Sequence, residues 1–410
     1  MTFELRRYLC QEMKNQKKKM IRFVEFMAIC LYHQELGYYM KQKNKVGKKG
    51  DFYTSSQVGN IFGETLSDSI LLFFRQNEMI DPVLMEVGGG TGRLMQQVLT
   101  RIREVDAELY ARLRVIMVEI SPYHVCLQQE SLHSFLLPKV WYDSVEEAAR
   151  NERFEGVIFS NEYFDAFPVH LLEKRQGEWH EIGIGFDPKV IPDTEERFTA
   201  TAILATSTTE ASKTLQLAHV DESQDIVFQE WNMPEISPEV VAIIPGLPIE
   251  LPDGMRIEVQ SGIAEVMNAF SSMLERGRVI SIDYGDIAED LYHPSRRKGT
   301  LSCYYQHQMN ENYLERVGEQ DITAHVNFSR LMECGDAVGL VTKSFTRQDQ
   351  FLLANGILEK AQAHQDTDPF TSVAMKRNRA IQQLLLPSGL GGLFRVLIQE
   401  KTQKKRENDI

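Results

Sequence analysis

Residues 83–92 read Val-Leu-Met-Glu-Val-Gly-Gly-Gly-Thr-Gly and are the most informative segment of the chain. Its first five residues form a short apolar run typical of a buried strand, and a long helical pattern follows from Arg93. A turn of this kind lies at the carboxyl edge of a parallel sheet, where α/β proteins bind ligands. Glycines let the backbone turn sharply and approach a ligand closely, because no Cβ intervenes. The stretch therefore predicts an α/β fold with a ligand site at the turn.

The same strand signal recurs on both sides of this turn. Short apolar runs stand at residues 115–119, 156–160 and 278–283, with helical patterns between them, and strand-like runs close the chain at 340–346 and 394–398. Apolar strands that alternate with helices predict a parallel sheet covered on both faces. We expect this core to comprise residues 81–186 and 257–400.

The remaining regions are assigned by their residue patterns. Residues 1–80 are predicted to be a helical N-terminal region, with helices at 20–36 and 61–74. Residues 187–256, rich in Thr, Ser and Pro, are predicted to be an inserted β-rich substrate subdomain. An irregular stretch at 285–318 could form a lid, because long loops in compact domains are often functional.

Composition limits the class of protein. The 410 residues are 43% hydrophobic and 25% charged, as in a soluble globular protein, and the net charge of −13 argues against non-specific nucleic-acid binding. The five cysteines are scattered without a C-x-x-C pair, which indicates reduced thiols and a cytoplasmic location. No histidine spacing indicates a metal site, and no apolar run is long enough to span a membrane.

Two cofactor classes use a glycine-rich turn of this kind. The dinucleotide pattern G-x-G-x-x-G requires a third glycine for close helix–strand packing, but Arg93 stands there. The pattern acid-x-G-x-G-x-G is instead that of S-adenosylmethionine, and Glu86 provides an acid that can meet the cationic amino group of this cofactor. The sequence thus favours S-adenosylmethionine over a nicotinamide dinucleotide.

Further acids follow at the ends of the next strands. Glu119 ends the second strand and is expected to accept hydrogen bonds from ribose hydroxyls. Asp143 and Ser144 follow a strand-like run and could hold the adenine. The predicted cofactor-binding residues of the core are Glu86, Gly88, Gly90, Gly92, Glu119, Asp143 and Ser144.

Several motifs resemble the MidA family of class I S-adenosylmethionine-dependent methyltransferases. They stand at residues 50–55, 61–64, 161–170, 282–285 and 318–326, in family order. The resemblance runs from about Phe23 to Ile398 and implies a Rossmann-like methyltransferase sheet with an added subdomain. Mitochondrial members assist respiratory complex I assembly and methylate a protein arginine. The chain departs from the family at Gly89, where Pro is commoner, and in residues 187–251.

The resemblance and the topology together select acceptor residues. Asn161, Glu162 and Asp165 follow the third strand, where the acceptor approaches, and are predicted to be catalytic. Carboxylates must bind and orient a guanidinium, because arginine is otherwise always protonated. The alternatives are a turn-stabilising role for Glu162 and a helix cap for Asp165.

Other polar residues complete the predicted site. The resemblance implies that a segment with Asp51, Phe52 and Thr54 closes over the cofactor, with Thr54 on the cofactor and the other two on the substrate. The alternative role of this segment is a loop cap. Asp283 and Tyr284 end the fourth strand and are expected to face the acceptor. Glu319 and His325, with Gln320 and Asp321, form either a second polar wall or a hydrogen-bonded turn.

The sequence therefore predicts an S-adenosylmethionine-dependent methyltransferase. The resemblance implies a protein substrate and arginine as the acceptor, and a homodimer is a further expectation. The alternatives are a methyltransferase of small molecules, a non-catalytic scaffold that keeps the cofactor pocket, and an NAD(P)-linked oxidoreductase.

Overall fold

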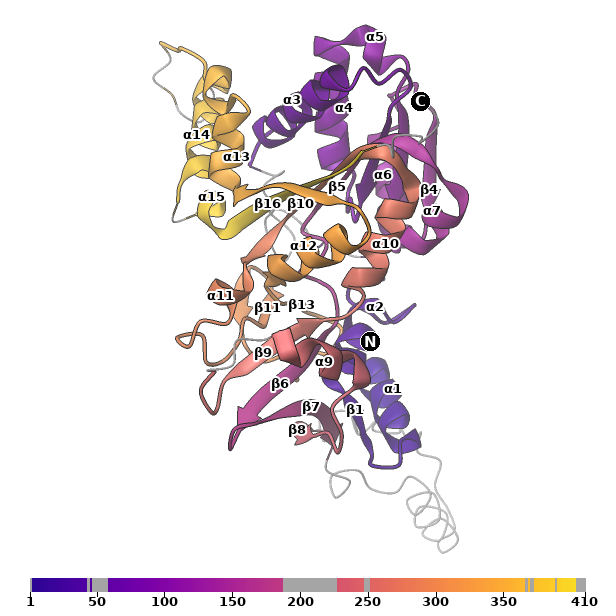
Figure 1. Ribbon diagram of the computed structural model, residues 1–410, viewed down its shortest axis with the longest axis vertical. Helices are drawn as coiled ribbons and strands as arrows, with labels where there is room; N and C mark the ends of the chain where they lie inside the picture. The colour runs from indigo at the N-terminus through magenta and orange to yellow at the C-terminus, as the bar shows by residue number, and fades with distance from the viewer. Residues whose placement is uncertain are drawn as a thin grey trace, which may run out of the picture.

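The computed structural model describes residues 2–42, 45, 58–186, 227–246, 251–365, 368, 372–387 and 389–402. Asp51, Phe52 and Thr54, and most of the predicted insertion at 187–256, lie outside these residues. The molecule is elongated, with the large sheet at one end and a smaller sheet at the other (Figure 1).

The large sheet has eight strands in the described part of the chain. Its path runs β4 (Lys139–Tyr142), β3 (Arg114–Val118), β2 (Val83–Val87), β5 (Phe154–Asn161), β10 (Leu274–Asp286), β16 (Phe394–Lys401) and β15 (Val341–Arg347). β14 (Val326–Asn327) pairs with the end of β10. Strands β4 to β10 are parallel, whereas β16 is antiparallel to both of its neighbours. The predicted α/β fold is confirmed.

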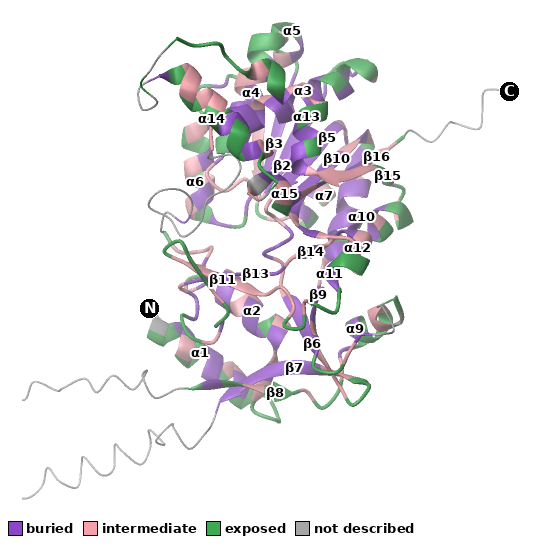
Figure 2. Ribbon diagram, turned by 90° about the vertical axis from the view of Figure 1, so that its left-hand side faces the viewer, coloured by how far each residue is buried: buried purple, intermediate pink, exposed green. Residues whose placement is uncertain are grey.

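Helices cover both faces of this sheet, because neighbouring strand residues point to opposite sides. Leu84 packs with α3 (Ile61–Gln76) and α4 (Arg93–Val105), whereas Val83 and Met85 pack with α7 (Val145–Asn151), α10 (Ile263–Met273) and α12 (Phe328–Ala337). α5 (Ala107–Tyr110) and α6 (Pro122–Ser131) complete the first face. Figure 2 shows the buried strands between these two layers.

The register aligns the strand ends that carry the predicted site. Val87 lies opposite Val118 on one side and Ser160 on the other, and Asn161 pairs with Ile282. Strand order reverses between β2 and β5, because the chain moves outward from β2 to β4 and then returns to the opposite side of β2. The crevice at the carboxyl ends of such strands is where open α/β sheets bind ligands.

The smaller sheet is antiparallel and combines segments that the sequence assigned to different regions. It contains β1 (Met20–Arg22), β7 (Glu178–Phe186), β6 (Val169–Arg175), β9 (Arg256–Gln260) and β8 (Phe228–Asn232). Its apolar residues pack against α1 (Thr2–Asn15) and α2 (Phe23–Tyr32). A short helix, α9 (Pro238–Ile243), and η3 (Ile244–Gly246) follow β8.

Three predicted boundaries differ from the structure. The predicted helix at 20–36 begins as β1, because residues 20–22 pair with Gly183, Ile184 and Gly185 of β7. The first segment of the predicted core, residues 81–186, includes β6 and β7, but these two strands form a hairpin in the smaller sheet. The irregular stretch at 285–318 contains α11 (Ala288–Leu291), β11 (Ser302–Tyr305) and β12 (Gln308–Asn310), and β11 also pairs with β13 (Asp321–Thr323).

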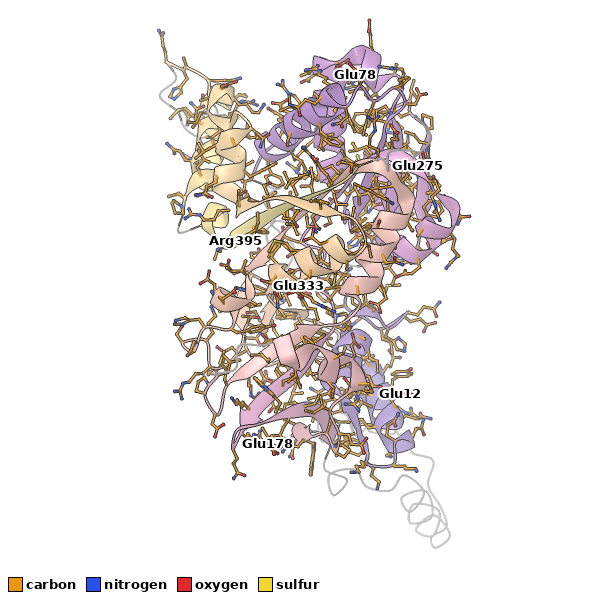
Figure 3. The ribbon with its side chains drawn as sticks, in the orientation of Figure 1. Glu12, Glu78, Glu178, Glu275, Glu333 and Arg395 are labelled. Carbon is orange, nitrogen blue, oxygen red and sulfur yellow. The ribbon has the colours of Figure 1, made fainter. Side chains whose placement is uncertain are left out.

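The remaining helices lie beside α3 at the large sheet. They are α13 (Gln348–Ala354), η4 (Ile357–Lys360), α14 (Val373–Leu385) and α15 (Leu390–Leu393). Exposed acidic side chains are spread over the molecule, with Glu78 and Glu178 at opposite ends (Figure 3). Within the described residues, no helix has the length and apolar character needed to cross a bilayer.

Candidate active site

A cavity of about 840 Å³ opens at the carboxyl ends of β2 and β5. Its wall contains the glycine turn after β2, the residues that follow β3, β4 and β5, and the start of α10. Residues of α2, β11 and β13 close the opposite side. The cavity therefore lies between the large sheet and the segments α2, β11 and β13, at the reversal of strand order.

The glycine turn has the backbone conformation that the sequence predicts. Gly88, Gly90 and Gly92 have positive φ angles of 69°, 52° and 74°. A Cβ on Gly90 would meet no atom within 4 Å, whereas one on Gly88 would come within 2.9 Å of the Tyr163 ring. Gly88 and Gly90 line the cavity, so a side chain on Gly90 would project into open space there.

Gly92 has a different role from the predicted one. It does not line the cavity, and a Cβ there would come within 2.6 Å of Ser131 Oγ and 3.1 Å of Gln128 Cα. The absence of a side chain thus allows α4 and α6 to pack closely beneath the turn.

Glu86 lies in the cavity wall with an unused acceptor atom. Glu86 is only 2% exposed, and its Oε2 is buried without a hydrogen-bond partner. Burial raises the pKa of this carboxyl to about 8, and the nearby Glu119 adds to the shift. A buried polar atom without a partner costs stability, so this oxygen suits a ligand that brings a donor.

Glu119 joins the glycine turn to α6. Its Oε2 accepts hydrogen bonds from the Gly90 N–H at 3.2 Å and from Gln128 Nε2 at 3.3 Å, and its Oε1 accepts from the Ser121 N–H at 2.9 Å. The carboxylate is therefore held at the cavity wall by three donors, and Oε1, which accepts one of them, keeps a lone pair for a further donor.

Asp143 and Ser144 line the same cavity after β4. Asp143 is exposed, and Ser144 is the N-cap of α7, where its Oγ accepts from the Glu147 N–H at 3.1 Å. The structure thus brings together Glu86, Gly88, Gly90, Glu119, Asp143 and Ser144.

The predicted catalytic residues lie next to this group, at the end of β5. Asn161, Glu162 and Asp165 all line the cavity. Asn161 Nδ2 donates to Glu162 Oε1 at 2.9 Å, and Asn161 Oδ1 is buried without a partner. Glu162 has a positive φ of 54°, a conformation that is uncommon outside glycine and often found at functional sites.

Burial shifts the titration of these acids upward. It raises the pKa of Glu162 to about 8, with a further contribution from Asp283. It also raises the pKa of Asp165 well above its usual value, and the neighbouring Asp283 and Glu162 add to this shift. Clustered buried carboxyls at a cleft are a recognised feature of functional sites.

The predicted substrate residues separate into two groups. Tyr284 lines the cavity, but Asp283 does not, because its carboxylate turns toward the backbone of residues 163–165. Glu319 and His325 also lie off the cavity. His325 is stacked on Tyr284 with ring centroids 6.5 Å apart, and burial lowers its pKa to about 4.

Four tyrosines in the cavity wall were not predicted: Tyr32, Tyr39, Tyr163 and Tyr304. Tyr32 and Tyr39 are stacked 5.5 Å apart, and the Tyr39 hydroxyl donates to Asp321 Oδ1 at 2.8 Å. Asp321, which the sequence grouped with Glu319, also lines the cavity. We call Asn161, Glu162, Asp165, Tyr284, Tyr304 and Asp321, with Tyr32 and Tyr39, the acceptor end of the cavity.

The wall thus fits S-adenosylmethionine on two structural grounds. The buried Glu86 oxygen lacks a donor, and the space above Gly90 is open. A match to a family model covers residues 65–346, and the family is described as S-adenosyl-L-methionine-dependent methyltransferase. The chain belongs to this family. The resemblance to MidA proteins is confirmed. The match also confirms S-adenosylmethionine, and not a nicotinamide dinucleotide, as the cofactor class.

Two curated relatives are named protein arginine methyltransferase NDUFAF7, mitochondrial. The Danio rerio protein is 28% identical over 91% of this chain and 82% of its own length, and the Homo sapiens protein is 26% identical over 91% and 78%. A methyltransferase-like crystal structure from Burkholderia thailandensis, bound to S-adenosyl-homocysteine, is 26% identical with a TM-score of 0.77. The structural match covers 98% of this chain and 94% of the Burkholderia chain. The chain is an S-adenosylmethionine-dependent methyltransferase with a Rossmann-like core.

Proposed function

We propose that this methyltransferase modifies an arginine side chain of a protein. The observation that carries the proposal is the acceptor end of the cavity, where three carboxyl side chains, Glu162, Asp165 and Asp321, lie among tyrosine rings. The names of the curated relatives support the same acceptor.

A guanidinium matches this set of groups. It is planar, carries five N–H donors and binds carboxylates in paired hydrogen bonds. It also stacks on aromatic faces, which the tyrosines provide.

Lys45, a buried cation in the wall, donates to the backbone carbonyls of Tyr39 at 3.1 Å and Lys41 at 2.8 Å, so its ammonium is engaged by the protein.

Two of these carboxylates, Glu162 and Asp165, have separate tasks in the proposed reaction. Glu162 binds the guanidinium and directs one nitrogen toward the cofactor, and Asp165 holds a second N–H. Holding the two reactants in a near-attack geometry supplies much of the acceleration. The raised pKa of Glu162 suits it to take up the proton that the methylated nitrogen releases.

The cofactor residues have separate tasks. S-adenosylmethionine, when bound, supplies an activated methyl group. We propose that Glu86 accepts from the amino group of the cofactor, that Glu119 accepts from its ribose hydroxyls, and that Asp143 and Ser144 hold the adenine. The open space above Gly90 admits the cofactor close to the backbone.

The test is transfer of an isotope-labelled methyl group into a lysate of the source cell, followed by mass spectrometry. The wild-type protein should label arginine in a protein, and Glu162→Gln should not. Label in RNA or in a small metabolite would contradict the proposal and identify a different acceptor class. Cofactor binding without any transfer would instead favour a scaffold protein.

A further inference from the structure

The loop of residues 162–166, which carries two of the proposed acceptor carboxylates, is held at most of its backbone groups. The Glu162 N–H donates to the Ile282 carbonyl at 2.9 Å, and the Phe164 carbonyl accepts from Gln260 Nε2 at 2.8 Å. The next two carbonyls accept from the Ala324 N–H at 3.0 Å and from the Tyr32 hydroxyl at 2.9 Å. Residues of α2, β9 and β10 and the residue after β13 thus fix one short segment.

The centre of this arrangement is Asp283. Its Oδ2 accepts from three successive N–H groups, those of Tyr163, Phe164 and Asp165, at 3.1, 2.8 and 3.3 Å. Its Oδ1 accepts from the Tyr284 N–H at 2.9 Å. The residue is fully buried and contacts the loop, not the cavity. Successive N–H groups that converge on one point form an anion-binding nest, and here the anion is a side chain of the protein itself.

We infer that Asp283 is a positioning residue, which holds the loop of residues 162–166 so that Glu162 and Asp165 face the acceptor. The inference rests on the proposed arginine acceptor for its activity test. It replaces the expectation that Asp283 contacts the acceptor directly.

The backbone of Glu162 gives this role a physical reason. A non-glycine residue with positive φ is strained, and it persists only where its surroundings fix it. The N–H groups of the three residues after Glu162 are held by Asp283, so the carboxylate prevents the loop from relaxing to a commoner conformation. Loss of this anchor should move Glu162 and Asp165 without altering the cofactor residues on β2 and β3.

The test compares Asp283→Asn with a matched control, Asp286→Asn. Asn has one acceptor oxygen where Asp has two, so its NH₂ group would face backbone N–H donors. Asp286 lies on the same strand, and its carboxylate pairs with Arg395 away from the cavity. A second variant, Gln260→Leu, loosens the same loop without removing a buried carboxylate, in case Asp283→Asn does not fold.

Three quantities are measured for each variant. They are the Kd of S-adenosylmethionine by calorimetry, kcat and KM with acetyl-Ala-Arg-Ala-amide, and hydrogen exchange of the amides of residues 163–165. Asp283→Asn should lower kcat/KM by about 100-fold, because small displacements of positioned groups have effects of that size. Its cofactor Kd should stay within about twofold, and the three amides should exchange at least about tenfold faster. Gln260→Leu should shift the same quantities less, and Asp286→Asn should shift none.

Two results would overturn the inference. One is a folded Asp283→Asn protein with wild-type kcat/KM or wild-type amide exchange. The other is a cofactor Kd that rises in proportion to the loss of activity, because the role would then be general to the fold. If the wild-type protein methylates no arginine, the proposed function fails, while amide exchange still decides the role of Asp283.

Discussion

Replacement of Glu86 by Gln should make the cofactor-free protein more stable and should weaken the binding of S-adenosylmethionine. Gln has nearly the shape of a protonated carboxyl group, so the surroundings need not change. The wild-type carboxyl is buried with one oxygen unpartnered, and burial raises its pKa from 4.5 to about 8. At neutral pH the folded protein therefore holds a proton on Glu86 that the unfolded chain releases.

The size of the effect follows from these two pKa values. A pH of 7 lies about 2.5 units above the pKa of 4.5 in the unfolded chain, and each unit corresponds to about 1.36 kcal/mol. Holding the proton on Glu86 at pH 7 therefore costs the folded state about 3 kcal/mol. Folding raises the pKa of Glu86, so the stabilising contribution of this residue is complete below about pH 4.5 and is lost as the pH rises toward 8. Glu86→Gln removes this loss and should be more stable than the wild type by about 3 kcal/mol at pH 7, with a gap that closes near pH 4.5.

The assay is urea unfolding without cofactor between pH 5 and 8, together with calorimetry of S-adenosylmethionine binding at pH 7.5. Loss of a hydrogen bond to a charged group costs about 1.5–3 kcal/mol, so the Kd should rise by roughly tenfold or more.

Glu258→Gln is the matched control. Glu258 is another buried carboxyl, but its oxygens accept from the Thr300 N–H and hydroxyl and from the Leu301 N–H. This variant should lose stability and bind the cofactor normally. The reasoning is refuted if Glu86→Gln is no more stable than the wild type at pH 7, or if it binds S-adenosylmethionine with the wild-type Kd.

Three further predictions concern other residues. Gly90→Val should abolish cofactor binding in calorimetry by filling the open space, whereas Gly254→Val, at another positive φ of 79° with no atom near its Cβ, should bind normally; equal binding would remove Gly90 from the site. At saturating cofactor, kcat/KM for the arginine peptide should rise with pH to a plateau above about 8 as Glu162 ionises, and Glu162→Gln should lower it and flatten the profile. Glu181→Ala should cost about 3 kcal/mol in urea unfolding, because it removes the ion-pair partner of Arg22 and the acceptor of the Ser237 N–H; a loss below about 1 kcal/mol would contradict this.

Local patterns predicted the large sheet because its strands, apart from the two-residue β14, each have a signal of their own. The apolar runs at 83–87, 115–119 and 156–160 and the glycine turn between strand and helix all stand at the positions expected. The carboxyl ends of parallel strands meet at one edge, so Glu86, Glu119 and Asn161 could be placed in one cavity without any knowledge of their distances.

The smaller sheet could not be predicted in the same way. Met20–Arg22 continues an apolar helical pattern, but it pairs with β7 as a strand. Gly183 of β7 leaves space for its backbone, because a Cβ there would lie 2.7 Å from the Ile21 carbonyl oxygen. The partner lies more than 160 residues away, so no local signal reports the pairing. Tertiary contact decided the structure there against the local pattern.

The acceptor end shows the same limit. Glu162 and Asp165 were found from their place after a strand, but Tyr32, Tyr39 and Tyr304 come from α2, the turn after it and β11. Isolated tyrosines have no motif, and only folding brings them together. Asp283 was expected at the end of its strand, but β10 runs on to Asp286. The direction of its side chain depends on loop N–H groups that the sequence does not show.

The most direct measurement is a crystal structure of the protein with S-adenosylhomocysteine. We expect the ligand above Gly90, its amino group about 3 Å from Glu86 Oε2 and its ribose hydroxyls on Glu119, with the acceptor end open beyond the sulfur. A ligand bound elsewhere, or a Glu86 oxygen still without a donor in the complex, would show that the site is assigned wrongly.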